Sequence, residues 1–278
     1  MTTQETVEMD INYTQKPNLE ELSESEFFAL DTPPFDVKKH CLYSVISGSK
    51  AYGLDTPTSD TDIRGVVYLP ERMLFGLGKC EQIENQSKDI CYWSVKRAFE
   101  LLLKNNPHIM EVIWNTRTVH FIHPLFQSVL DNKHIFTSKR LGYAYSVYAH
   151  QQLILLDTKR KNGTGRVAQM ENWAYDYKFA MHTVRLLRSG AEFLNSGELQ
   201  VYRPDKKELL EIRNGKYSFE EFVKFEENNK KKQIVGGMIK DEIRKFEEAF
   251  ENSTLPNEPP FEQIEKLLIT LQKNCLTL

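Results

Sequence analysis

Apolar residues in the first part of the chain come in short runs that are typical of buried strands. Such runs lie near residues 42–46, 63–69 and 89–93, and each is bounded by polar or turn-forming residues. Helical patterns follow at Ser94–Lys104 and Pro107–Trp114, where the proline suits the first turn of a helix. The pattern predicts a mixed sheet with flanking helices.

From about residue 138 the strand signals fade and apolar residues recur at helical spacing. We therefore expect an α/β (α+β) fold in which the sheet is followed by a C-terminal helical domain. The expected helices of this second part lie at Leu141–Leu156, Val167–Leu187, and near 205–213, 218–227, 233–251 and 261–272.

These patterns divide the chain into three segments. Residues 1–24 are polar and rich in Thr and Glu, and we expect them to form a flexible N-terminal extension. Residues 25–135 would form the domain that contains the sheet, and residues 136–278 the helical domain.

Composition and charge limit the cellular compartment and the kinds of partner that we expect. The four cysteines of the 278 residues are scattered, which argues for a reducing compartment and against structural zinc. No signal peptide or long apolar run is recognisable, so we expect a cytoplasmic protein without a membrane partner. The net charge of −3 means that any nucleic-acid contact must come from local basic patches. The oligomeric state stays open.

The most informative stretch joins a Gly48-Ser49 turn to two aspartates, Asp60 and Asp62, between two strand-like runs. Residues two apart on a strand point to the same face, so the two carboxylates would lie side by side at a sheet edge. Mg²⁺ prefers carboxylate, water and phosphate oxygens, and a Gly-Ser turn can bind a phosphate. An ordinary surface turn is the alternative for these residues.

A site with two metal ions needs a third carboxylate, and Asp89 is the best candidate. It opens the strand-like run at 89–93, and it can share a face with Asp60 and Asp62 if the two strands are neighbours. We expect Asp89 to bind the second metal and to polarise an acceptor hydroxyl. The alternative is an aspartate at the start of a strand without a ligand.

The stretch Gly48–Gly65, with Ser59-Asp60-Thr61-Asp62 in it, resembles the signature of the DNA polymerase beta nucleotidyltransferase superfamily. Together with later runs that include Tyr175–Lys178 and Val201–Gly215, it resembles a family of predicted bacterial and phage nucleotidyltransferases, over residues 40–220. This resemblance implies a nucleotidyltransferase-type sheet in residues 25–135, and metal-dependent transfer of a nucleoside monophosphate from a triphosphate to a hydroxyl. It does not identify the acceptor, although members of the narrower family have been linked to RNA repair.

The second half carries a basic stripe that could complete this site. Lys178, His182 and Arg185 follow one another at helical spacing, so they would face the cleft and bind the triphosphate. A solvated helix face is the alternative. Ser59, Arg64 and Tyr52 join the expected nucleotide-binding set. Arg64 has the same strand parity as Asp60 and Asp62, and Tyr52 follows the Gly48-Ser49 turn, from which it would stack on the nucleobase. Arg64 would otherwise pair with a carboxylate, and Tyr52 would otherwise pack its helix onto the sheet.

The sequence thus predicts an enzyme of the nucleotidyltransferase type. Asp60, Asp62 and Asp89 would be catalytic and would bind Mg²⁺, with Mn²⁺ as the alternative metal. Gly48, Ser49 and the basic stripe would hold a nucleoside triphosphate, and RNA is the expected acceptor. A protein or small-molecule acceptor is one alternative, and a non-catalytic module that senses nucleotides or binds a partner is another.

Overall fold

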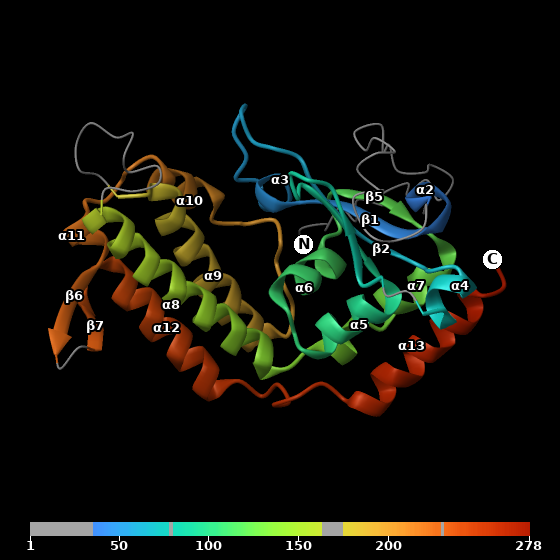
Figure 1. The fold of residues 1–278 in the computed structure, drawn as a ribbon. Helices are drawn as coiled ribbons and strands as arrows, with labels where there is room; N and C mark the ends of the chain where they lie inside the picture. The colour runs from blue at the N-terminus through green and yellow to red at the C-terminus, as the bar shows by residue number, and fades with distance from the viewer. Residues whose placement is uncertain (1–35, 78–79, 163–174, 229–230) are drawn as a thin grey trace, which may run out of the picture.

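The computed structural model describes residues 36–77, 80–162, 175–228 and 231–278 (Figure 1). The extension predicted for residues 1–24 lies outside these ranges. Within them, no helix combines the length and the apolar character that crossing a membrane requires.

A five-stranded mixed sheet forms the first part of the molecule, with strand order β3-β4-β2-β1-β5. β2 pairs with β1 in antiparallel and with β4 in parallel orientation. Because Ser47 pairs with Asp62 and Ile63 pairs with Ile90, the end of β1 and the starts of β2 and β4 meet at one edge. The strands are β1 (Cys41–Ser47), β2 (Asp62–Val67), β3 (Gln82–Glu84), β4 (Ile90–Ser94) and β5 (Val119–Ile122).

The three central strands confirm the predicted runs, and the two outer strands were not predicted. β3 and β5 are the edge strands of the sheet, and each is only three or four residues long. An edge strand has one neighbour and needs little apolar sequence, so the pattern of polar and apolar positions gives little sign of it.

Short helices surround the sheet, and their caps explain where they begin. The Ser94 hydroxyl accepts a hydrogen bond from Arg97 N, and the Asn106 side chain accepts one from His108 N beside Pro107. This confirms the two predicted helices. The helices of this part are α2 (Val37–His40), α3 (Gly48–Tyr52), α4 (Glu71–Phe75), α5 (Val95–Leu103), α6 (Pro107–Trp114), α7 (Pro124–Asp131) and the 3₁₀ turn η1 (Lys133–Phe136).

The second part is mainly helical, and its longest helices, α8 and α9, pack along each other (Figure 1). A helix was expected near 218–227, and only the first part of this segment is helical, at Phe219–Phe222. The rest forms a hairpin in which Phe225 pairs with Ile234, because the alternation of Val223 and Phe225 with polar residues also fits a strand. The elements are α8 (Lys139–Asn162), α9 (Tyr177–Ser196), α10 (Lys206–Arg213), α11 (Phe219–Phe222), β6 (Lys224–Asn228), β7 (Lys231–Gly236) and α12 (Met238–Asn252).

The last helix, α13 (Phe261–Cys275), returns to the sheet part and packs against α5 and α7 (Figure 1). Its buried residues Ile264, Leu271 and Cys275 belong to the same apolar cluster as the cores of both parts. The C-terminal residues therefore lie on the sheet part, although the rest of the second half forms a separate helical layer.

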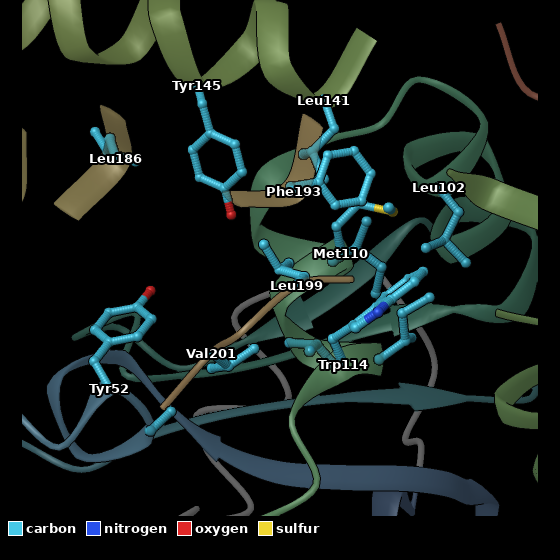
Figure 2. Close-up of a cluster of buried hydrophobic side chains, with 14 of the residues drawn as sticks. Tyr52, Leu102, Met110, Trp114, Leu141, Tyr145, Leu186, Phe193, Leu199 and Val201 are labelled. Atoms are coloured by element: carbon cyan, nitrogen blue, oxygen red, sulfur yellow. The ribbon is translucent and has the colours of Figure 1, made fainter. Parts of the chain in front are cut away.

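One continuous apolar cluster connects the two parts (Figure 2). In it, Trp114 and Met110 of α6 lie near Phe193 of α9, and the segment with Leu199 and Val201 runs between the two parts. The same segment is tied to α3, because Arg203 N donates to the Tyr52 carbonyl oxygen over 3.1 Å. Packing on both sides therefore fixes the position of the sheet part relative to the helical part.

Candidate active site

A cavity of about 720 Å³ lies where the sheet edge meets the helical part. Its size is in the range of small-molecule sites. Of the eleven site residues predicted from the sequence, Asp89 does not line the cavity, and the other ten do. These ten are Gly48, Ser49, Tyr52, Ser59, Asp60, Asp62, Arg64, Lys178, His182 and Arg185.

Gly48 brings the turn after β1 against the carboxylate of Asp62. Its φ is +65°, a left-handed conformation that favours glycine. A Cβ atom at this position would lie 2.1 Å from Asp62 Oδ2, so no side chain fits there. The glycine therefore sets both the turn and the position of the carboxylate.

The loop that leads to Asp60 is held by its own hydrogen bonds. Ser59 Oγ accepts from Thr56 N over 2.8 Å, and Lys50 Nζ donates to Thr61 Oγ1. Ser59 thus has a partner within the loop while it also lines the cavity. These bonds link the loop to α3 and hold Asp60 at the cavity mouth, where its side chain is exposed.

The carboxylate of Asp62 is partly buried and lies among like charges. Burial raises its pKa, and the charges of Asp89 and Asp60 act in the same direction, whereas Arg64 and Lys178 lower it. Arg64 Nη2 lies 3.3 Å from Asp62 Oδ1. The pairing expected as the structural role of Arg64 is therefore present, although the residue also lines the cavity.

Asp89 comes directly before β4, just as Asp62 comes directly before Ile63, the residue that pairs with Ile90. Its main-chain oxygen accepts from Ile63 N over 2.7 Å and from Arg64 Nη1 over 2.6 Å. Its carboxylate is close enough to Asp62 to raise that pKa. The structure thus places Asp89 beside the aspartate pair but outside the cavity wall.

The opposite wall is basic and comes mainly from α9. The Asp176 side chain caps this helix by accepting from Lys178 N and Phe179 N, and it thereby fixes the helix start before the stripe. Burial, together with the neighbouring charges of Arg185, Lys178 and Arg213, lowers the pKa of His182 to about 3. His182 is therefore neutral at physiological pH and lies among cations.

Arg213, at the end of α10, is a cavity residue that the sequence analysis did not assign. Its Nη1 donates to the Leu54 carbonyl oxygen over 2.6 Å. This bond ties α10 to the turn after α3 and points the guanidinium at the same space as the stripe. The only sequence signal was its position in the run Val201–Gly215.

Glu111 of α6 is the centre of a buried cluster on the cavity wall. Its carboxylate accepts from Arg185 Nη1 over 2.8 Å, from Tyr145 OH over 3.0 Å and from Tyr52 OH over 2.5 Å. The Arg185 charge and the Tyr52 hydrogen bond overcome burial and hold the pKa of Glu111 below its usual value. The cluster joins helices from both parts of the molecule.

This cluster changes the picture of Tyr52 and Arg185. Tyr52 is buried, with the Arg185 guanidinium 4.0 Å from its ring centre. It therefore has a packing role, as in the alternative to nucleotide binding, but these contacts are with α6 and α9 and not with the sheet named in that alternative. Arg185 is paired with Glu111, but its Nε has no hydrogen-bond partner among the described residues. This nitrogen is buried, so Arg185 contributes its positive charge to the cavity wall.

No curated protein matches the chain, and no solved structure does. The model of the RNA repair pathway DNA polymerase beta family (RlaP) matches residues 14–270, which is nearly the whole chain. The mixed sheet with flanking helices and a C-terminal helical part is the nucleotidyltransferase architecture expected of such a protein. The chain therefore belongs to the RNA repair pathway DNA polymerase beta family and is a nucleotidyltransferase of that type.

Proposed function

We propose that the protein transfers a nucleoside monophosphate from a nucleoside triphosphate to a hydroxyl of an RNA acceptor, with release of pyrophosphate. One observation carries this proposal: a single cavity has carboxylates on one wall, at Asp60 and Asp62, and cations on the other, at Lys178, Arg185 and Arg213. A metal-bound triphosphate needs both kinds of group at once.

The acidic wall fits Mg²⁺, or Mn²⁺ in its place. Asp62 and Asp60 offer hard oxygen donors, and the raised pKa of Asp62 reflects burial and neighbouring carboxylates that a divalent cation would compensate. No three His, Cys, Asp or Glu side chains within the described ranges form a ready-made metal site. Mg²⁺ commonly takes only one or two protein carboxylates and completes its shell with water and substrate oxygens.

The basic wall fits the triphosphate. Lys178 offers a point charge, and Arg185 adds a second positive charge from a position that Glu111 fixes. Ser49 adds a hydroxyl next to the aspartates. Because His182 is neutral, it can donate or accept a hydrogen bond at a phosphate oxygen without adding a fixed charge.

In the proposed reaction the acceptor oxygen forms a bond to the α-phosphorus, and the bond from that phosphorus to the bridging oxygen breaks in line. The acceptor hydroxyl loses its proton to a carboxylate at the sheet edge, for which Asp89 remains our prediction. When bound, the metal would neutralise charge on the phosphates and lower the pKa of the hydroxyl. The protein supplies positioning and charge rather than a covalent intermediate.

The choice of RNA as acceptor is supported by the family description. The test incubates each α-labelled nucleoside triphosphate with Mg²⁺ and total cellular RNA. It compares the wild type with Asp60→Ala/Asp62→Ala and with Asp55→Ala. Asp55 is an exposed residue of the same loop that does not line the cavity, so it provides a matched control.

We expect label in RNA with the wild type and with Asp55→Ala, and a loss of at least about 10²-fold in the double variant. Label that moves to protein or a small molecule would change the acceptor and keep the chemistry. Equal transfer by the double variant would contradict the assignment of the aspartates. Nucleotide binding by the wild type without pyrophosphate release would indicate a non-catalytic module.

A further inference from the structure

The part of the cavity wall that α6 and α8 supply differs in chemistry from the α9 wall. It contributes Pro107, His108, Glu111, Tyr148 and Gln152, and neither a lysine nor an arginine. This wall therefore does not hold phosphates by charge. Its rings and its amide suit a flat ligand with hydrogen-bonding edges.

The order of residues along the two long helices shows how this wall faces the basic stripe. Tyr145 of α8 and Arg185 of α9 both bond Glu111, so these two positions are level. Further along, Lys159 Nζ lies 3.9 Å from the Phe179 ring centre. The helices are thus antiparallel (Figure 1). Positions Tyr148 and Gln152 follow Tyr145 at about one and two turns, alongside His182 and Lys178.

This wall has two aromatic rings, one from α6 and one from α8. His108 and Tyr148 meet with ring centres 6.5 Å apart and an interplanar angle of 66°, and both line the cavity. His108 is exposed and Tyr148 is half-buried, so neither ring is fully buried in the core. An exposed ring face in a cavity can stack on a nucleobase, and such stacking is worth about 1–3 kcal/mol per base.

Gln152 lies about one turn beyond Tyr148 on the same face of α8. Its amide has no hydrogen-bond partner in the parts of the chain that are described, and it lines the cavity in a half-buried position. An amide carries both donors and an acceptor, so it can pair with the edge of a base. Gln is one of the side chains that read base edges in this way.

We propose that His108, Tyr148 and Gln152 bind the nucleobase of the bound nucleoside triphosphate, with Gln152 setting the preference among bases. The proposal rests on the proposed function, because the basic stripe must hold the phosphates for the base to reach this wall. It adds a specificity site to a cavity whose catalytic side faces the sheet. The base of the acceptor terminus is the other source of the same chemistry.

The test measures equilibrium binding of the four nucleoside triphosphates, with Mg²⁺ and without acceptor, to four proteins. These are the wild type, Gln152→Leu, Gln152→Glu and Gln151→Leu. Gln151 is the exposed neighbour that does not line this cavity, so its variant is the matched control. Melting temperatures in the absence of nucleotide verify that all four proteins are folded.

We expect the wild type and Gln151→Leu to share one order of base preference, which Gln152→Leu should flatten by about tenfold. Gln152→Glu has only acceptors, so the affinity ratios should shift toward bases that present an exocyclic amino group. Unchanged ratios in both Gln152 variants would overturn this proposal. Absence of any triphosphate binding by the folded wild type would overturn the proposed function itself.

Discussion

Gly48 shows how one residue can fix the geometry of a whole site. Its left-handed backbone and the closeness of Asp62 Oδ2, which would lie 2.1 Å from a Cβ atom, are both incompatible with a side chain. The turn and the sheet edge that carries Asp62 are therefore coupled. A residue that bears no functional group decides where the functional groups lie.

We expect Gly48→Ala to lower transfer by about 10²-fold or more, because the new methyl group must displace Asp62. It should also cost about 1–2 kcal/mol of stability from the left-handed conformation. Gly197→Ala is the control: its φ is +73°, but its Cβ would lie 3.5 Å from Leu255, an ordinary contact. Activity assays with thermal melts should show a similar stability loss in both variants and lost transfer in Gly48→Ala alone.

His182 gives a pH dependence whose sign follows from its surroundings. In the folded protein its pKa is lowered to about 3, whereas an unfolded chain keeps the ordinary value of 6.5. Between these values the unfolded state binds more protons, so stability falls as the pH falls. Melting temperatures at about pH 7 and pH 5 should drop more for the wild type than for His182→Gln. Equal drops would contradict a buried neutral histidine.

At the scale of elements, the Glu111 cluster fastens α3, α6, α8 and α9 to one another. Each helix contributes one polar group, and all four groups meet in a buried place. A second set, in which Arg188 bonds Asp205, Glu208 and Glu242, joins α9 to α10 and α12. The helices around the cavity are thus held by ionic contacts as well as by apolar packing.

We expect Glu111→Gln to destabilise the protein by about 3 kcal/mol, because it leaves the Arg185 charge buried without a counter-charge. The control is Glu248→Gln, which breaks an exposed pair with Arg244 on α12 and should change stability by less than about 0.5 kcal/mol. Urea unfolding at neutral pH provides the comparison. A small effect at Glu111 would show that Arg185 finds another partner.

For the whole molecule, the continuous core predicts that the two parts unfold together. The apolar cluster contains residues of α5, α6, α8 and α9, and it includes Leu271 of α13. Because α13 starts after the helical part and packs on the sheet part, the chain runs from one part to the other and back. The sheet part also has a smaller apolar cluster of its own, which includes Val67, Tyr92 and Phe121, and the larger cluster joins the rest of its core to the helical part.

Leu271→Ala should therefore lower the stability of both parts by the same amount, about 2–5 kcal/mol for a buried leucine. Ile269→Ala removes an exposed side chain of the same helix and serves as the control. Tryptophan fluorescence, to which Trp93 and Trp114 of the sheet part contribute, and far-ultraviolet circular dichroism should give coincident transitions. Two separate transitions would contradict a single cooperative unit.

The sequence by itself determined the features that depend on residues close to one another along the chain. The central strands follow from apolar runs, and the Gly48-Ser49 turn ahead of Asp60 and Asp62 follows from residue types that suit few other places. Helical spacing alone aligned Lys178, His182 and Arg185. These residues line one cavity because the periods of strand and helix decide which side chains share a face.

Only the tertiary structure decided what lies opposite each face. The partner of Arg185 is Glu111, 74 residues away, and Arg213 reaches Leu54 across 159 residues. The edge strands, the β6–β7 hairpin and the return of α13 to the sheet likewise depend on what is available to pack against. Local sequence patterns do not show which remote segments will pair, since this pairing is selected by the shape and charge of the assembled core.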